Sequence, residues 1–103
     1  MTICEDVWND EDFWRDRRYR RNPAAELAAA GATVLFNNSA SPWQLGKNET
    51  RAKMLSQLAA KTKRPLVYCN LVGGNDELIF DGRSLVCDAQ GQLVAGLAAF
   101  AED

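Results

Sequence analysis

The sequence predicts an α/β fold in which a mixed sheet carries two main helices on one face. Two short apolar runs, residues 33–36 and 66–70, are rich in strand-forming residues and lack polar alternation, which is typical of strands covered on both faces. A helical pattern precedes each run, over residues 24–30 and 47–62. Two further strand-like runs near the C-terminus are joined by turn residues. The order is therefore strand, helix, strand, helix, strand and a hairpin, in a single domain of 103 residues.

Both helices carry boundary signals. Asn22 can cap the free amides of the first helix, Pro23 suits its first position, and Gly31 can close it. The second helix ends before Pro65 and places its apolar residues on one stripe. The members of that stripe are Ala52, Met54, Leu55, Leu58 and Ala59.

Polar segments follow the predicted strands at the edge where open α/β sheets build their sites. Residues 37–42 are expected to form a polar loop, and residues 73–77 a second loop that contains two glycines. The second loop is interpreted as a turn, because it lacks the glycine spacing of a phosphate-binding loop. The last two strands, residues 85–87 and 93–95, are joined by residues 88–91 in a tight hairpin.

The charge and composition exclude several classes of function. The net charge of −2 and a pI near 5.1 give no general basis for binding nucleic acid. No apolar run approaches the roughly 20 residues of a membrane-spanning helix, and the N-terminus lacks a basic and then apolar export pattern. We therefore expect a cytoplasmic protein that binds neither nucleic acid nor membrane.

The three cysteines and the absence of histidine restrict the chemistry further. Cys4, Cys69 and Cys87 are odd in number and far apart, so we expect reduced thiols and no metal site. Without histidine, Ser-His-Asp and Cys-His catalysis are excluded within the chain. A nucleophilic cysteine here would need a different base.

Cys4 is the candidate nucleophile. It lies where a strand gives way to a turn, and the charged residues Glu5 and Asp6 follow it directly. A lone cysteine is more often a small buried apolar residue. Two adjacent carboxylates would not ordinarily be placed beside a core thiol, and they favour the reactive alternative.

The segment of residues 9–21 contains four acidic residues and five arginines, with three aromatic residues between them. We interpret it as a solvated helix or an ordered loop, in which Glu11 and Arg15, and Asp16 and Arg20, have the spacing of helical ion pairs. The alternative is an arginine patch for phosphates or a protein partner. The near cancellation of charge favours the first interpretation.

The stretch Ile3-Cys4-Glu5-Asp6-Val7-Trp8 resembles the nucleophile motif of the nitrilase, or carbon-nitrogen hydrolase, superfamily. The resemblance is to the glutamine-hydrolysing domain of the glutamine-dependent NAD synthetases in particular, and it implies part of a four-layer α-β-β-α sandwich. Further segments resemble that family in the same order, namely residues 31–35, 38–42, 46–51, 70–74, 76–84 and 86–91.

The resemblance implies a role for four residues. Cys4 would attack the side-chain amide of glutamine, Glu5 would bind the substrate ammonium, and Ser41 would bind its α-carboxylate with help from Lys47. From the residues alone, Ser41 and Pro42 could equally form a plain turn before a helix, and Glu5 could be a solvated neighbour. The implied product is ammonia for NAD synthesis. The alternatives are another amidase of the superfamily, acting on a carbamoyl or aliphatic amide, and a non-catalytic remnant that serves as a structural or interaction module.

In the family, a glutamate base and an oxyanion-stabilising lysine precede the cysteine strand, whereas this chain starts at that strand. Residues 1–103 are therefore expected to be the C-terminal portion of the glutaminase domain, with no cofactor of their own. ATP and Mg are implied only for a synthetase domain that the chain does not contain. We expect the isolated chain to be inactive without its N-terminal half, and to form a homo-oligomer through exposed apolar residues. Those residues are Val34, Leu35, Val67 and Val86.

Overall fold

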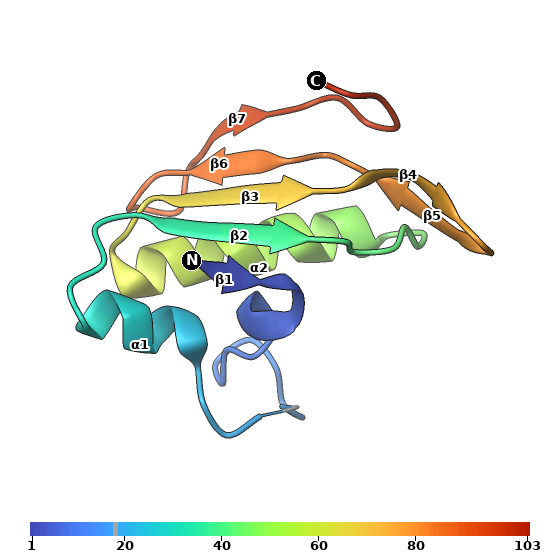
Figure 1. Cartoon of the computed structure of the whole chain (residues 1–103). Coiled ribbons are helices and arrows are strands. Elements are labelled where there is room, and N and C mark those ends of the chain that lie inside the picture. The colour runs from blue at the N-terminus through green and yellow to red at the C-terminus, as the bar shows by residue number, and fades with distance from the viewer. Residues whose placement is uncertain (18) are drawn as a thin grey trace.

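The computed structural model describes residues 1–17 and 19–103, and Figure 1 shows their arrangement. These described residues form a five-stranded sheet, a separate two-stranded hairpin, two α-helices and one short 3-10 helix. The elements are β1 (Thr2–Ile3), the 3-10 helix η1 (Cys4–Val7), α1 (Pro23–Ala29), β2 (Leu35–Ser39), α2 (Lys47–Thr62), β3 (Leu66–Asn70), β4 (Val72–Asn75), β5 (Leu78–Asp81), β6 (Leu85–Cys87) and β7 (Leu93–Gly96).

The main sheet is mixed, as the sequence predicts, with the strand order β1-β2-β3-β6-β7. β1, β2 and β3 are parallel, whereas β6 is antiparallel to β3 and β7 is antiparallel to β6. The carboxyl ends of the three parallel strands therefore meet at one edge of the sheet (Figure 1). β4 and β5 form their antiparallel hairpin beyond that edge.

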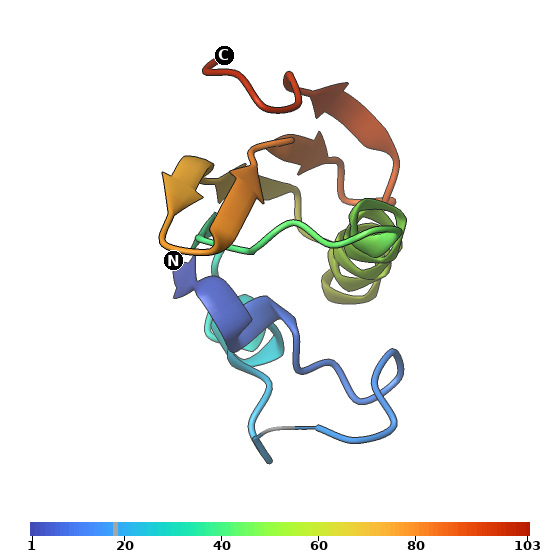
Figure 2. The same ribbon diagram turned by 90° about the vertical axis from the view of Figure 1, so that its right-hand side faces the viewer.

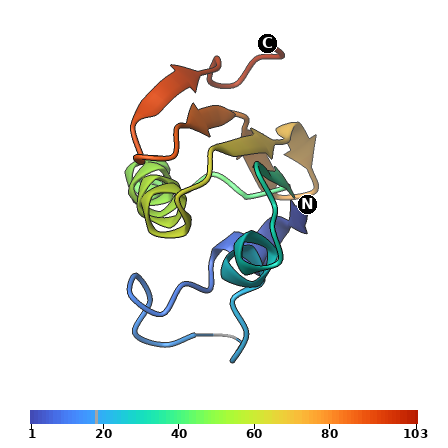
Figure 3. The same cartoon turned by 90° about the vertical axis from the view of Figure 1, so that its left-hand side faces the viewer.

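Both α-helices lie on the same side of the main sheet, as Figures 2 and 3 show. The core is the layer between these helices and the sheet. It combines leucine and tyrosine side chains of β2, β3 and β6 with the apolar stripe of α2 and with Ala24 of α1. Its largest members are Leu35, Leu66, Tyr68 and Leu85 from the sheet, and Met54, Leu55 and Leu58 from α2.

The structure confirms both predicted helices, and their boundary signals act locally. The Asn22 side chain accepts a hydrogen bond from the backbone N–H of Ala25 at 3.2 Å, and Pro23 is the first helical residue. Gly31 follows α1 with a φ of 98°, a conformation that favours glycine. The predicted range of α2, residues 47–62, agrees with the observed helix.

The prediction that the strands are covered on both faces is wrong. Side chains alternate along β2, so that Leu35 is 2% exposed beneath the helices and Phe36 is 51% exposed on the opposite face. Because both helices pack on one side, the other face is open within the 103 residues. The expectation that Leu35 is exposed is wrong, because its side chain points toward the helices. Val34 is exposed as expected, at 38%. Val67 and Val86 are half-buried on the open face.

Two predicted loops are partly strands. Residues 37–39 extend β2, so the loop begins at Ala40. The two glycines predicted to lie in a turn belong to β4, where Gly73 pairs with Phe80 and Gly74 pairs with Ile79. Glycine has no side chain to pack in a strand, so backbone pairing with β5 holds these two residues in β4.

The segment of residues 9–21 forms a loop, which is one of its two predicted forms. The expected helical pairs, Glu11 with Arg15 and Asp16 with Arg20, do not form between these described residues. Glu11 instead contacts Arg17 at 3.3 Å and Lys61 of α2 at 2.9 Å. Arg18, one of the five arginines of the segment, lies outside the described residues.

The turn between β6 and β7 packs closely on α2, and we expect Gly91→Ala to lower the free energy of unfolding by about 1–3 kcal/mol. A Cβ at Gly91 would lie 2.5 Å from the backbone oxygen of Ser56, and the φ of 82° favours glycine. Gly96→Ala is the control, because nothing lies within 4 Å of a Cβ there. Urea denaturation at low protein concentration measures both variants, and equal effects would contradict the close packing of this turn.

Candidate active site

Cys4 lies at the junction between β1 and η1 with a φ of 47°. Residues other than glycine adopt this region rarely, at a cost of order 1–3 kcal/mol, and such positions cluster at functional sites. The chain turns sharply at this residue, immediately beyond the carboxyl end of β1. The thiol is half-buried and free.

Hydrogen bonds from both sides hold this turn. From β2, the Asn37 amide donates to the hydroxyl of Thr2 at 3.0 Å and to the carbonyl of Cys4 at 3.5 Å. The Ser39 hydroxyl donates to the Asn37 side chain at 2.7 Å and orients that amide. On the other side, the Asp6 carboxylate accepts the backbone N–H of Ile3 at 2.9 Å. The unusual backbone at Cys4 is thus fixed by the neighbouring strand and by its own 3-10 helix.

A pocket of about 350 Å³ opens beside Cys4. All four site residues predicted from the sequence line it, although they come from two separate parts of the chain: Cys4 and Glu5 from η1, and Ser41 and Lys47 from the β2–α2 loop and the start of α2. The remaining lining residues are Trp8, Trp14, Asp16, Pro42 and Gln44.

Lys47 is the first residue of α2 and carries a positive charge among the described residues that line the pocket. Its ammonium donates to the carbonyl of Pro42 at 2.9 Å and lies 5.4 Å from the centre of the Trp8 ring. Burial lowers the pKa of Lys47, and the positive charge of Arg51 lowers it further, while Asp81 and Cys4 act in the opposite direction. The partly desolvated amine thus lines the same pocket as the thiol.

Ser41 is 5% exposed, and Asn70 at the end of β3 fixes its backbone. The Asn70 side-chain oxygen accepts the N–H of Ser41 at 2.9 Å, and its amide donates to the carbonyl of Gly82 at 2.9 Å. A longer contact of 3.5 Å joins the same amide to the carbonyl of Ser41. The loop that carries Ser41 is consequently anchored to β3.

Behind this loop lies a buried ion pair. Arg51 of α2 and Asp81 of β5 are 2.7 Å apart, and each side chain is 1% exposed. The guanidinium of Arg51 also lies 5.7 Å from the centre of the Tyr68 ring, and the second oxygen of Asp81 accepts the Asn70 amide at 3.4 Å. The pair thus connects the helix that carries Lys47 to the side chain that holds Ser41.

The loop of residues 9–22, hereafter the acidic loop, forms another wall of the pocket. Asn9 is buried and closes the loop by donating to the backbone carbonyls of Tyr19, at 2.9 Å, and Arg21. Stacking of Trp14 on Trp8, with ring centres 5.6 Å apart, places the loop against η1. At its far end the hydroxyl of Tyr19 donates to the carboxylate of Glu5 at 3.0 Å.

Three acidic residues fasten the acidic loop to α2 through one lysine. The ammonium of Lys61 lies 3.0, 2.9 and 2.7 Å from the carboxylates of Asp10, Glu11 and Asp12. Burial opposes the charge on Lys61, but the three carboxylates outweigh it and raise its pKa. The hydrogen bond from Lys61 in turn lowers the pKa of Glu11 to about 2.

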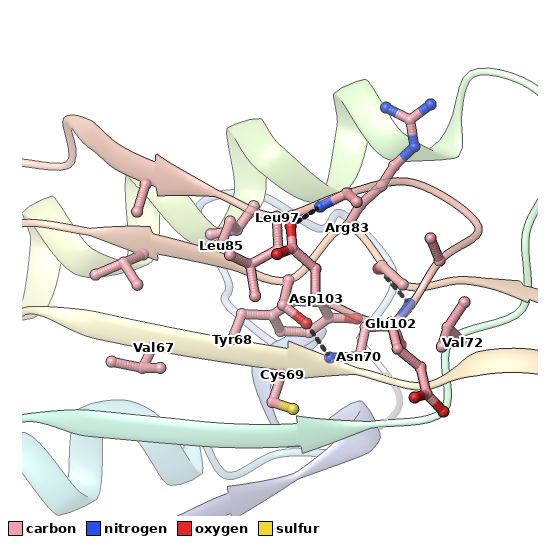
Figure 4. A pocket seen from close by; sticks show the side chains of 16 residues that line it. Val67, Tyr68, Cys69, Asn70, Val72, Arg83, Leu85, Leu97, Glu102 and Asp103 are labelled. Carbon is pink, nitrogen blue, oxygen red and sulfur yellow. Dashed lines mark hydrogen bonds between the residues drawn. The ribbon is translucent and has the colours of Figure 1, made fainter.

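A second pocket of about 360 Å³ lies on the open face of the sheet, over β3 and β6 (Figure 4). Cys69, Arg83, Glu102 and Asp103 are among its lining residues. None of the four predicted site residues lines it. All four predicted site residues therefore line the pocket at the carboxyl edge of the sheet and not this second pocket.

Neither a metal cluster nor a membrane span is found in residues 1–17 and 19–103. Within these ranges no three His, Cys, Asp or Glu side chains are grouped to hold a metal ion. No helix there has the length and apolarity to cross a bilayer.

Several residues of the site escaped the sequence reasoning. Trp14 and Asp16 lie in the segment of residues 9–21, to which the sequence assigned no role in the site. Arg51 is buried because it lies four and seven positions before Leu55 and Leu58, on the apolar stripe of α2. A charged residue on that stripe was the sign of a buried partner.

Comparison with known proteins identifies the class. The family model for the carbon-nitrogen hydrolases matches residues 14–103. The chain belongs to the carbon-nitrogen hydrolase family.

Within that family the chain is similar to glutamine-dependent NAD(+) synthetases. The Synechocystis enzyme is 45% identical over all 103 residues, and the Thermotoga maritima enzyme is 41% identical over 95 residues, or 91% of the chain. The chain covers 18% and 15% of these two relatives, so it spans less than one fifth of their length.

Solved structures give the same result for the fold. A glutamine-dependent NAD+ synthetase from Acinetobacter baumannii, in complex with ADP, matches with a TM-score of 0.83 at 33% identity over 99% of this chain and 18% of that one. An amidase of the nitrilase superfamily from Nesterenkonia matches with a TM-score of 0.73 at 24% identity, over 93% of this chain and 32% of that one, which supports the fold alone. The expected family and nitrilase-like fold are confirmed.

We expect Asp81→Asn to lower the free energy of unfolding by about 3–5 kcal/mol, because it leaves the buried guanidinium of Arg51 without its counter-charge. The matched control is Glu26→Gln, which breaks the exposed contact between Arg21 and Glu26 and should cause no measurable loss. Urea denaturation at low protein concentration compares the two. Similar stabilities for both variants would contradict the central role of the buried pair.

We expect the Glu11 carboxyl to titrate near pH 2 in the folded chain. Its folded pKa lies below the ordinary value of 4.5, so the contact with Lys61 stabilises the fold above about pH 4.5, and this stabilisation is lost as the pH falls toward 2. The contribution is small, because the group is solvated. NMR titration of the side-chain carboxyl measures this value, and Lys61→Met should return it toward 4.5. A midpoint near 4.5 in the unmodified chain would show that the loop is not fastened in this way.

Proposed function

We propose that this chain carries the nucleophile and substrate pocket of a glutaminase domain, which hydrolyses the side-chain amide of glutamine and supplies ammonia for NAD synthesis in a longer protein. The observation that carries the proposal is the meeting of Cys4, Glu5, Ser41 and Lys47 in one pocket. Similarity to the glutamine-dependent NAD(+) synthetases of Synechocystis and Thermotoga maritima favours glutamine as the amide over other substrates of the family.

The chemistry proceeds through a thioester. The sulfur of Cys4 bonds to the carboxamide carbon of glutamine, the carbon–nitrogen bond breaks, and the nitrogen leaves as ammonia with the proton of the thiol. Water then adds to the thioester carbon and releases glutamate and the free thiol. This sequence replaces one difficult hydrolysis by two easier steps.

The pocket offers partners for both charges of a free amino acid. The carboxylate of Glu5 suits the substrate ammonium, and the region of Ser41 and Lys47 suits the α-carboxylate. The backbone N–H that follows Cys4 is the proposed donor to the tetrahedral oxyanion, a contact worth about 3–4 kcal/mol in other enzymes. The general base and the oxyanion-stabilising lysine of the family are proposed to come from segments outside these 103 residues.

The test uses a full-length chimera, in which this chain replaces the matching segment of the Synechocystis synthetase. We expect Cys4→Ala to abolish NAD synthesis driven by glutamine and to leave synthesis driven by added ammonia unchanged, because only the first requires the thioester. Cys69→Ala is the control, since Cys69 lies on the open face of the sheet and outside the pocket. Equal loss of both activities in Cys4→Ala would count against the assignment.

Alone, the 103-residue chain is expected to release no ammonia from glutamine and to self-associate. General-base assistance is typically worth about 10²- to 10⁴-fold, and the pocket residues have other proposed roles. The open face exposes the large apolar side chains of Ile3 at 62% and Phe36 at 51%, and Val94 of the edge strand β7 is 60% exposed. An ammonia assay and light scattering of the purified chain test both expectations. A monodisperse monomer with steady glutaminase activity would overturn them.

A further inference from the structure

The acidic residues of the acidic loop divide into two groups. Asp10, Glu11 and Asp12 all contact the ammonium of Lys61 and fasten the loop to α2. The fourth, Asp16, lies among the residues that line the pocket of Cys4. Its carboxylate makes no hydrogen bond or ion pair within residues 1–17 and 19–103, so its charge is available to a molecule in the pocket.

The loop is held on both sides of Asp16. Before it, the backbone N–H of Trp14 donates to the carbonyl of Asp10 at 2.9 Å, and the Trp14 ring packs between Trp8 and Phe13, with ring centres 5.6 and 4.9 Å away. After it, Arg17 contacts Glu11 at 3.3 Å. These contacts place Asp16 at the pocket wall without using its own side chain.

The described residues that line the pocket carry charges of both signs, with carboxylates on Glu5 and Asp16 and an ammonium on Lys47. Glu5 already has a partner, because the hydroxyl of Tyr19 donates a hydrogen bond to it at 3.0 Å. The Asp16 carboxylate has none among the described residues. An amide substrate that bears an ammonium group would give Asp16 an opposite charge, whereas an amide without that group would not.

We propose that Asp16 is a specificity-determining residue, which selects amides that carry an α-ammonium group over amides that lack it. The inference deepens the proposed glutaminase function and rests on it. It also gives the acidic loop a role, since its contacts with Lys61 and the stacked tryptophans hold Asp16 at the wall of the pocket that Cys4 lines.

The experiment compares two substrates that differ only in the charge in question, in the same full-length chimera. One is glutamine and the other is its des-amino analogue, 4-carbamoylbutanoate. Asp16→Asn keeps the size of the side chain and removes its charge. We expect kcat/KM for glutamine to fall by about tenfold, mainly through KM, and kcat/KM for the des-amino amide to stay the same or rise.

Two further variants separate charge from loop structure. Asp12→Asn removes a carboxylate from the same loop but outside the pocket, and the ratio of the two kcat/KM values should not change, because Asp10 and Glu11 still hold Lys61. Asp16→Glu should retain part of the preference for glutamine. Equal losses on both substrates in Asp16→Asn would reduce Asp16 to a structural residue, and no change on either would overturn its role altogether.

Failure of this inference is distinguishable from failure of the glutaminase assignment. If the chimera with Asp16 intact hydrolyses neither amide, the glutaminase assignment fails. Calorimetric binding of glutamine and of 4-carbamoylbutanoate to the Cys4→Ala chimera, with and without Asp16→Asn, then decides the role of Asp16 without turnover. Weaker binding of glutamine alone in Asp16→Asn would support the proposal, and unchanged binding would overturn it.

Discussion

Two opposite charges, the guanidinium of Arg51 and the carboxylate of Asp81, lie 2.7 Å apart in the interior, where each side chain is 1% exposed. Neither group can be solvated there, so Arg51 depends on Asp81 for its counter-charge. Asp81 also accepts the amide of Asn70 at 3.4 Å and lies 3.4 Å from Arg83. Because Arg51 belongs to α2, Asp81 to β5 and Asn70 to β3, the positions of three elements become interdependent. The same contacts fix two residues of the pocket, since α2 begins with Lys47 and Asn70 holds the backbone of Ser41.

The parallel order of β1, β2 and β3 explains why the site residues meet. Parallel strands end at the same edge of a sheet, and that edge receives η1 with Cys4, the loop with Ser41 and the end of β3 with Asn70. The turn at Cys4 is strained, and hydrogen bonds from the adjacent strand β2 maintain it. The acidic loop then closes one side of the pocket through contacts that reach α2. The walls of the pocket therefore come from η1, from the acidic loop, and from the β2–α2 loop with the start of α2.

Local signals in the sequence predicted the helices and most strands, because caps, proline and apolar periodicity act within a few residues. The four predicted residues were grouped through the family resemblance, and their separation in the chain would have hidden the pocket otherwise. Long-range effects were beyond such reasoning. The one-sided covering of β2 depends on where the helices pack. The ion pairs of the acidic loop were assigned by helical spacing, whereas Asp10 pairs with Lys61, 51 residues away. The burial of Arg51 depends on Asp81, which lies in the β4–β5 hairpin. The two glycines of that hairpin had been interpreted as part of a turn.

The three cysteines differ in exposure and in surroundings, and this difference allows a direct test of the claim that Cys4 is the nucleophile. Cys69 is exposed, Cys87 is buried with a pKa raised by that burial and by Asp88, and Cys4 is half-buried in the pocket. The decisive measurement is mass spectrometry of the full-length chimera after treatment with an electrophilic analogue of glutamine. A single adduct on Cys4 that excess glutamine prevents is the predicted result. Labelling that follows exposure, with Cys69 modified in preference to Cys4 and no protection by glutamine, would contradict the account.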